Sequence, residues 1–462
     1  MMPDVMSAIG QDDRYLLVRA GALYVALVLT VVSWACRRPR ACVIGGAALA
    51  GLWNVPVLLA LHLLATRAGW WWFDADGGLL LGMPVDLLLV WAWLWGVIPA
   101  LAFSSWPISR VALIALAVDL VLMPAAAPVL TLGPTWLAGE AIGLLAGLVP
   151  GQLLARWTLR DERLVPRAVL QVIAFGGLLV FVLPAIAIDA SGGAWLNPFS
   201  RPTWQLSLLI QAAAVPALIG LTAVQEFVER GGGTPVPFDP PRRLVTTGIY
   251  AYVRNPMQLS ALLLLVVMGG VLHNIWIAAA GVMAHLYSVG FAGWDEDEDV
   301  RARSGDDWAI YRRGVRRWVP RIRPWSRGDT PPGRLFVAGG CDMCREVGRW
   351  FERHHATHLV TLPAETHPSG ALTRVTYEPS DGTRAASGIE AIARALEHIH
   401  LGWALVGFFL RIPVIRPLVQ ILADACGAEP RRLPASPMGV RGGGPDTCAR
   451  RSGYTTPAQP RQ

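Results

Sequence analysis

The chain has 462 residues, of which 53% are hydrophobic and only 16% are charged. This composition lies outside the usual range of soluble proteins and indicates a membrane protein. The formal net charge is +7, and the sequence contains arginine but no lysine. Because the arginines fall mainly in short segments beside apolar runs, the positive-inside rule explains them better than nucleic-acid binding does. We therefore expect no nucleic-acid partner.

Nine apolar runs have lengths near the roughly 20 residues that a helix needs to cross the hydrocarbon core. They cover residues 16–34, 43–65, 79–103, 108–128, 136–155, 168–190, 204–227, 257–272 and 274–291. Backbone amides in lipid need partners within their own segment, so we expect each run to be a helix. The first run has spanning length and lacks a cleavage site, which favours a retained anchor over a signal peptide. The predicted fold class is mainly α, a polytopic helical membrane protein with about nine spans.

Arginines follow the odd-numbered runs more often than the even-numbered ones. The loops after the first, third, fifth and seventh runs hold Arg37, Arg38, Arg40, Arg110, Arg156, Arg160, Arg163, Arg167, Arg230, Arg242 and Arg243. In the intervening loops the arginines are Arg67 and Arg201. The positive-inside rule therefore predicts a multi-pass protein of the cell membrane, with its N-terminus outside and everything after residue 291 in the cytoplasm.

Changes in composition divide the chain into four parts. These are a multi-span module at 1–165, a second membrane domain at 166–325, a small domain at 331–433 and a polar tail at 434–462. The small domain mixes short β-like runs with helical patterns, which predicts a cytoplasmic α/β domain. The tail is rich in Gly, Pro, Ser, Thr and Arg, and it cannot bury enough apolar surface to order itself.

The first module carries acids and a cluster of tryptophans at membrane depth. Asp86, Asp119 and Glu140 lie within or beside apolar runs, and acids in such places are candidates for a functional site. Packed helix contacts explain these acids equally well, and an interfacial belt explains the tryptophans. A chamber for a hydrophobic substrate is one hypothesis for this module, whose role stays open.

The segment 231–257, GGGTPVPFDPPRRLVTTGIYAYVRNPM, is polar and rich in Pro and Gly between long apolar runs. Tyr250 and Tyr252 supply aromatic faces, Arg254 would be costly in lipid, and Pro256 opens the next apolar run. Proline is well tolerated in the first turn of a helix, and the preceding amides remain available to a ligand. A binding segment is one interpretation, and an interfacial arginine that reaches toward water beside an aromatic belt is the other.

A second segment, 294–320, reads WDEDEDVRARSGDDWAIYRRGVRRWVP and begins with four acids, Glu296, Asp297, Glu298 and Asp299. They are compatible with a solvated helix start, where acids are favourable, but a bound cation or nearby arginines would also relieve their repulsion. A ligand with a carboxylate, an ammonium group, a sulfonium cation and a flat base would use an arginine, acids and tyrosine faces together. S-adenosylmethionine fits that inventory.

The two segments together resemble the isoprenylcysteine carboxyl methyltransferase and phospholipid methyltransferase superfamily of integral membrane enzymes, over about residues 204–322. The family motifs read approximately GPYRYVRHPMYLG and EExxLxxxFGxxYxxY. By this resemblance, the residues expected along S-adenosylmethionine are Tyr250, Tyr252, Arg254, Asn255, Pro256, Glu296 and Asp297. Trp308 and Tyr311 match the two aromatic positions after Gly305.

Several positions depart from the family pattern, namely Ile249, Ala251, Asn255, Gln258, Ser260, Asp297 and Ser304. Asn255 replaces a histidine, so it keeps hydrogen-bonding groups but does not titrate. A carboxylate or thiolate acceptor needs no general base, only alignment with the methyl donor and exclusion of water. An amine or hydroxyl acceptor needs a general base, and Glu296 is the nearest candidate for it. The resemblance thus implies catalytic roles for Arg254, Asn255 and Glu296. It also implies an acceptor that is a lipid, an isoprenoid or another hydrophobic molecule.

The small C-terminal domain contains the one close cysteine pair, in RLFVAGGCDMCREVGRWFERHH. This pattern predicts a strand, a Gly-Gly turn and a helix that begins at Cys341. A helix start lowers thiol pKa, so Cys341 is the expected attacking thiolate and Cys344 the resolving one. Zinc is less favoured, because there is one CxxC pair and the nearby histidines have no familiar ligand spacing; we expect no metal site. A pair without chemistry is the remaining alternative.

Residues 333–433 resemble the DCC thiol-disulfide oxidoreductase-like family, whose motif reads approximately YDGxCxxC. This resemblance implies a thioredoxin-like fold and a redox partner for the pair. Ala338 stands in place of the family's aspartate, which leaves a structural or partner-binding role open. The leading hypothesis from sequence is a membrane methyltransferase fused to this domain. A membrane-anchored thiol-disulfide protein and a non-enzymatic scaffold are the alternatives.

Overall fold

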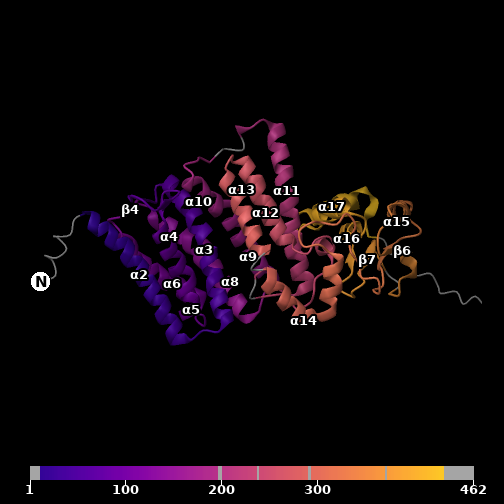
Figure 1. The fold of residues 1–462 in the computed structure, drawn as a ribbon, viewed down its shortest axis with the longest axis horizontal. Helices are drawn as coiled ribbons and strands as arrows, with labels where there is room; N and C mark the ends of the chain where they lie inside the picture. Colours follow the sequence, from indigo (N-terminus) through magenta and orange to yellow (C-terminus); the bar gives the residue numbers. More distant parts are fainter. Residues whose placement is uncertain (1–10, 196–199, 237–238, 290–292, 370–371, 431–462) are drawn as a thin grey trace, which may run out of the picture.

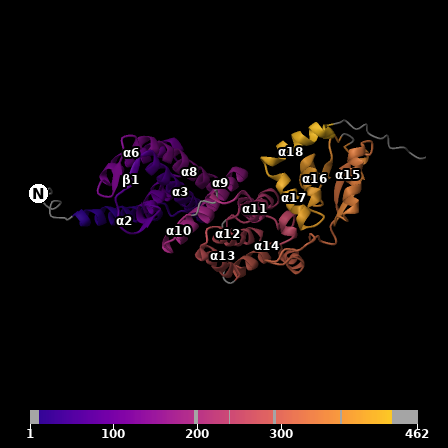
Figure 2. The ribbon, with the colours of Figure 1, turned by 90° about the horizontal axis from the view of Figure 1, so that it is seen from above.

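The computed structural model describes residues 11–195, 200–236, 239–289, 293–369 and 372–430, with side chains left undescribed at 11–14, 287 and 293–299. The elements form a row: an N-terminal helical bundle, a second group of helices and a C-terminal α/β part (Figure 1). Viewed from above, the same order is seen along the long axis (Figure 2).

Among the described residues, seven segments are helical, long and apolar enough to cross a membrane. They are Tyr15–Arg37, Ala41–Ala68, Val85–Ala102, Ile108–Ala125, Trp136–Arg160, Leu164–Ala190 and Thr203–Gly231. Each coincides with one of the first seven apolar runs, so hydropathy located these helices correctly.

The expectation of nine spans is wrong for the last two runs. They form the shorter helices α12 (Pro256–Val271, 16 residues) and α13 (Ile275–Tyr287, 13 residues). The chain turns sharply between them, where His273 has a positive φ of 51° and the Asn274 side chain accepts a hydrogen bond from the Trp276 amide at 3.0 Å. At 1.5 Å per residue, neither helix reaches across roughly 30 Å of hydrocarbon.

The N-terminal bundle is built around one central helix. Its helices are α2 (Gln11–Arg37), α3 (Ala41–Ala68), α4 (Val85–Ala92), α5 (Ile98–Ala102), α6 (Ile108–Ala125), α7 (Trp136–Gly143) and α8 (Val149–Arg160). Helix α3 is the central one, with buried residues along its whole length. It approaches its neighbours closely through glycine, since a Cβ at Gly96 would lie 2.7 Å from backbone atoms of Ala50.

The acids of this bundle take part in contacts between elements. Asp86 pairs with Arg19 at 2.6 Å, and Asp119 accepts a hydrogen bond from the Trp95 indole at 2.8 Å. Glu140 is 1% exposed and lines a cavity of about 30 Å³, which has room for about one water molecule. These contacts favour a packing role for Asp86 and Asp119.

The second group of helices carries the 231–257 segment at one end. It comprises α9 (Leu164–Gly177), α10 (Leu183–Ala190), α11 (Thr203–Glu226), α12, α13 and α14 (Gly293–Gly314). The N-terminal bundle also contains two short antiparallel ribbons, which pair β1 (Trp71–Phe73) with β4 (Leu130–Leu132) and β2 (Leu79–Leu80) with β3 (Met83–Pro84). Helices α11 and α12 pack closely because Gly220 faces Ser260, whose hydroxyl donates to the Pro216 carbonyl at 2.7 Å. In Figure 1, α14 lies near the lower end of α11 and α12.

The C-terminal part has a four-stranded sheet of order β6-β5-β7-β8. Its elements are β5 (Gly333–Val337), α15 (Asp342–Arg353), β6 (Leu359–Pro363), β7 (Thr376–Glu378), β8 (Ala386–Ser387), α16 (Ile389–Leu396), α17 (Leu401–Arg411) and α18 (Ile415–Ala423). Strands β5 and β6 are parallel, as the intervening helix α15 requires, and the other pairs are antiparallel. Leu335, Phe351 and Tyr377 lie in the core under this sheet.

The C-terminal part packs directly onto the preceding apolar helices. Ala404 and Phe408 of α17 belong to the same buried cluster as Ile249 and Tyr252 of the 231–257 segment and Ile219 of α11. The helix after the sheet therefore completes the core of the preceding domain, and the boundary near residue 331 marks a change of composition rather than a gap in packing.

Candidate functional site

The two segments singled out from the sequence meet in space. The amide of Arg254 donates to the Arg316 carbonyl at 3.0 Å, and the amide of Asn255 donates to the Arg317 carbonyl at 3.2 Å. Two more backbone hydrogen bonds join the same segments: the Trp325 amide donates to the Ala251 carbonyl at 2.8 Å, and the Arg321 amide donates to the Tyr252 carbonyl at 2.9 Å. The chain after α14 therefore lies along the 248–256 loop and fixes its shape.

Aromatic residues of α14 pack against this loop and position a cation. The Tyr311 hydroxyl donates to the Tyr250 carbonyl at 2.7 Å, and Tyr311 is 2% exposed. Burial raises the pKa of Tyr311 despite the nearby Arg254, so this hydroxyl stays neutral and remains a donor. The Arg254 guanidinium carbon lies 5.3 Å from the centre of the Trp308 ring, within the range of a cation–π interaction.

The two tyrosines of the loop differ in what they contact. Tyr250 is buried with its ring 6.1 Å from that of Phe227. Tyr252 is completely buried, and its hydroxyl donates to the carbonyl of Glu397 in the C-terminal part at 2.8 Å. The hydroxyl of Tyr252 is thus committed to an interdomain contact, a role that the sequence motif did not indicate.

Pro256 begins α12, as expected from its position after the loop, and Asn255 occupies the residue before it. The Asn255 side-chain amide donates to Gln258 Oε1 at 2.7 Å. Asn255 and Gln258 both depart from the family pattern, and here they hydrogen-bond to each other. Arg254 and Asn255 are half-buried, so these two side chains are the partly accessible part of the loop.

Of the two acids predicted to contact the cofactor, only the backbone can be placed. Glu296 and Asp297 lie in the first turns of α14, and their side chains fall outside the described residues. Helix α14 is kinked at Gly305, whose φ of 51° and ψ of −125° are favourable only for glycine. The kink separates the acidic start of α14 from the part that carries Trp308 and Tyr311.

A buried group of charges lies directly beneath the loop and was missed by the sequence analysis. Glu226 at the end of α11 is 0% exposed, and its carboxylate accepts a hydrogen bond from the Thr247 hydroxyl at 2.9 Å. Arg411 Nη1 lies 2.7 Å from Glu226 Oε1, and Arg394 also donates to that oxygen. Arg411 also pairs with two further carboxylates of the group, with its Nη1 2.8 Å from Glu397 Oε1 and its Nη2 3.1 Å from Glu229 Oε2.

Gly248 lets the loop approach this charge group. Its φ is 59°, and a Cβ at this position would lie 2.6 Å from the Glu226 carboxyl carbon. The glycine of the TTG turn is therefore required twice, by its backbone conformation and by the space it leaves. The sequence did contain a signal for this charge group, namely the charged residues of VQEFVER at the end of an apolar span. Burying such charges is unfavourable unless other charged residues pair with them.

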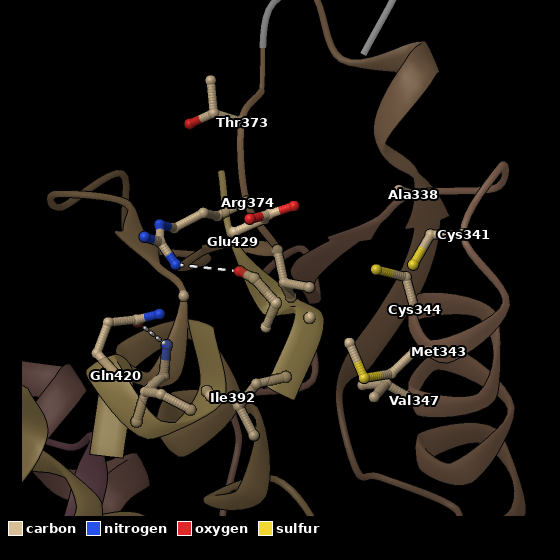
Figure 3. A pocket seen from close by; sticks show the side chains of 16 residues that line it. Ala338, Cys341, Met343, Cys344, Val347, Thr373, Arg374, Ile392, Gln420 and Glu429 are labelled. Carbon is tan, nitrogen blue, oxygen red and sulfur yellow. Dashed lines mark hydrogen bonds between the residues drawn. The ribbon is translucent and has the colours of Figure 1, made fainter. Parts of the chain in front are cut away.

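The cysteine pair lies at the edge of a separate cavity. Cys341 caps the start of α15, directly before its first residue Asp342, so the predicted helix start is one residue early, and Cys344 lies in the first turn. Together they line one side of a cavity of about 220 Å³. Figure 3 shows the two cysteines on one wall and Arg374, Gln420 and Ile392 on the facing wall. Both are half-buried, and most of the other lining side chains are apolar.

The histidines near the cysteine pair take part in other contacts. The His354 ring lies 4.0 Å from the Trp350 ring, and His358 is 3.1 Å from the Thr330 hydroxyl. No group of three or more potential metal ligands is assembled among the residues that the structure describes. No known protein family, curated protein or solved structure matches this chain.

Proposed function

We propose that this protein is an integral membrane methyltransferase that uses S-adenosylmethionine and acts on a hydrophobic acceptor such as a lipid or an isoprenoid. The observation that carries the proposal is the joining of the 248–256 loop to the segment after α14 by backbone hydrogen bonds, with Arg254 over Trp308. The sequence motifs that suggested a cofactor site lie far apart in the chain, and packing makes them neighbours. By the arginine distribution, the site faces the cytoplasm and the N-terminus lies outside.

The residues present suit the cofactor in charge and exposure. Arg254 is a half-buried cation held by an aromatic face at the end of the apolar helices, and a guanidinium is well matched to a carboxylate. Tyr311 holds the loop through the hydrogen bond from its hydroxyl to the Tyr250 carbonyl, so it acts as a positioning residue in this proposal. Tyr252 would support the loop from the C-terminal side, so it acts as a positioning residue in this proposal.

The bound cofactor would supply a sulfonium methyl group. Asn255, bonded to Gln258, offers hydrogen bonds but no titrating group, which fits an acceptor that is already an anion, a carboxylate or a thiolate. The protein's contribution is then alignment of the two groups and exclusion of water.

Calorimetry with S-adenosylhomocysteine on the full chain in detergent tests this proposal. We expect saturable heat for the wild type, and a loss of affinity of roughly tenfold or more in Arg254→Ala, because a charge-assisted contact is removed. Arg323→Ala is a matched control, because this arginine is exposed in the same C-terminal stretch. An absence of binding to the folded wild-type protein would refute the methyltransferase.

A second candidate function, thiol-disulfide exchange, is favoured by the surroundings of the cysteine pair. The parallel unit β5-α15-β6 places Cys341 at a helix start beside an open cavity, an arrangement typical of redox pairs. The Cys341 thiolate would attack a partner disulfide, form a mixed disulfide and release one partner thiol. Attack by Cys344 would then release the second partner thiol and leave the Cys341–Cys344 disulfide.

Cys344→Ser separates the two functions. If the pair is redox-active, this variant accumulates the mixed disulfide, visible as a band that disappears with reductant, while Cys426→Ser, at an exposed cysteine, does not. Cofactor binding is expected to be the same in both variants. If Cys344→Ser traps no mixed disulfide, even with an added peptide disulfide, the exchange function is excluded.

A further inference from the structure

Helices α17 and α18 present an apolar face that no part of the described protein covers. Val414, Leu418, Ile421 and Leu422 are 70%, 60%, 66% and 65% exposed. Their spacing along the chain places them on one side of α18 and the turn before it. Phe409, near the end of α17 and before the bend, is also 48% exposed. A cluster of large apolar side chains this exposed indicates a contact surface.

The opposite side of α18 is held firmly by the C-terminal domain, so its outward face is fixed. Gln420 Oε1 accepts a hydrogen bond from the Ile389 amide at 2.8 Å. Arg416 pairs with Glu390 of α16 at 2.8 Å. Gln420 and Ala423 line the cavity of the cysteine pair. The helix therefore cannot turn its apolar residues inward without breaking these contacts.

The position of α17 relates this face to the membrane. Ala404 and Phe408 pack in one cluster with Ile219 and Ala223 of the spanning helix α11. Ile219 precedes Glu226 by seven residues, which corresponds to about 10 Å along the helix axis. Helix α17 therefore packs against the C-terminal half of α11 rather than beyond its end, and Figures 1 and 2 both show the two helices side by side.

Helix α11, against which α17 packs, also exposes apolar residues. Leu208, Val215 and Leu221 of α11 are exposed apolar residues of a helix that can cross the membrane. Helices α17 and α18 meet at a bend of 95°, and with 11 and 9 residues each is far too short to cross. A bent apolar pair that packs about 10 Å before Glu226, where charged residues begin at the end of α11, fits the boundary between headgroups and acyl chains.

We propose that the corner formed by α17 and α18 is inserted in the bilayer interface, with Phe409, Val414, Leu418, Ile421 and Leu422 in contact with lipid. The C-terminal domain is then not a soluble appendage on a linker but a domain seated in one leaflet. Because Gln420 and Ala423 lie on the other side of α18, the cavity of Cys341 and Cys344 is one helix away from the lipid. A ligand of that cavity would be apolar.

Photolabelling of the unaltered full chain in lipid nanodiscs tests the proposal without a variant. The nanodiscs would contain a phospholipid with a photoreactive group in its acyl chain, and tryptic peptides would be examined by mass spectrometry. We expect lipid adducts on peptide 412–431 and on peptides of α11, and none above background on peptide 354–374, which carries β6. Equal labelling of 412–431 and 354–374 would overturn the proposal.

Spin labels provide a second, independent measurement. Labels at Leu418→Cys and Leu422→Cys, in full chains whose native cysteines are replaced by serine, are compared with Glu352→Cys on the exposed side of α15. Contact with lipid predicts high collision rates with oxygen and roughly threefold or more lower rates with a water-soluble nickel complex than at Glu352. Protection from both reagents would mean that a second copy or the chain beyond residue 430 covers the face, and it would refute lipid contact.

Discussion

Arg411 Nη1 lies 2.7 Å from Glu226 Oε1, and the two side chains are 1% and 0% exposed. One residue belongs to the C-terminal domain and the other ends α11, which lies in a segment long and apolar enough to cross a membrane. Glu226 also holds Thr247, the residue before the turn into the 248–256 loop. The pair therefore ties the C-terminal domain to the base of the candidate cofactor site, and each domain is expected to depend on the other.

Arg411→Met should strongly destabilise the protein. The variant leaves the carboxylates of Glu226 and Glu397 without this partner, and breaking a buried pair typically costs roughly 3–5 kcal/mol. Thermal unfolding in detergent measures the effect. Arg416→Met is the matched control, because its ion pair with Glu390 is partly exposed and is expected to contribute about 1 kcal/mol or less. Equal losses in the two variants would mean that the buried pair has no special role.

Gly248→Ala should displace the loop and weaken cofactor binding. The added methyl group would meet the Glu226 carboxyl, and the φ of 59° is unfavourable for alanine. Strain of this kind costs roughly 1–3 kcal/mol, so we expect both a lower melting temperature and weaker binding of S-adenosylhomocysteine. Gly270→Ala is the control, since it lies in α12 and a Cβ there meets nothing within 4 Å. A neutral Gly248→Ala would show that the loop is not constrained as described.

Tyr252→Phe distinguishes support of the loop from contact with the cofactor. The variant removes the hydrogen bond to the Glu397 carbonyl, so we expect a loss of roughly 1 kcal/mol in stability with little change in affinity for S-adenosylhomocysteine. Calorimetry and thermal unfolding are measured on the same sample. A selective loss of affinity at unchanged stability would place the Tyr252 hydroxyl at the cofactor, as the sequence motif suggested.

The stability of the protein should fall in mild acid because of His398. Burial lowers the pKa of its imidazole to about 4 from an ordinary value of 6.5. Between these values the unfolded chain binds a proton that the folded protein excludes, so stability rises with pH and is lost as pH falls from 6.5 toward 4. The loss between pH 7 and pH 5 is expected to be about 2 kcal/mol.

His398→Gln should flatten this pH dependence, whatever its effect at neutral pH. The imidazole lies between the Thr357 carbonyl at 2.9 Å and the Tyr377 hydroxyl at 2.8 Å, and its burial disfavours the charged form. His400→Gln, at an exposed histidine, is the control and should retain the wild-type slope. Melting temperatures measured from pH 7 to pH 5 give the comparison, and identical slopes in all three proteins would contradict the assignment.

Local features of this protein were predictable from its sequence. Seven apolar runs became helices at the expected places, Pro256 began α12, and Cys341 lies directly before the start of α15. Each depends on neighbours in the chain: the length of an apolar run, a proline without an amide hydrogen, or a Gly-Gly turn after a strand. The turn between α12 and α13 and the shortness of these helices could also be seen in the sequence, because the runs on either side of His273 are among the shortest of the nine.

The tertiary structure alone decided which charges meet. Glu226, Arg394 and Arg411 each lie on a helix where a charge by itself is unremarkable or unfavourable, and nothing local shows that they share one buried site. The commitment of the Tyr252 hydroxyl to Glu397 and the exposed face of α18 were hidden for the same reason. Hydropathy and turn chemistry act over a few residues, so the sequence determines the helices. Ion pairing and burial join residues distant in the chain, so only the packed structure determines the partners.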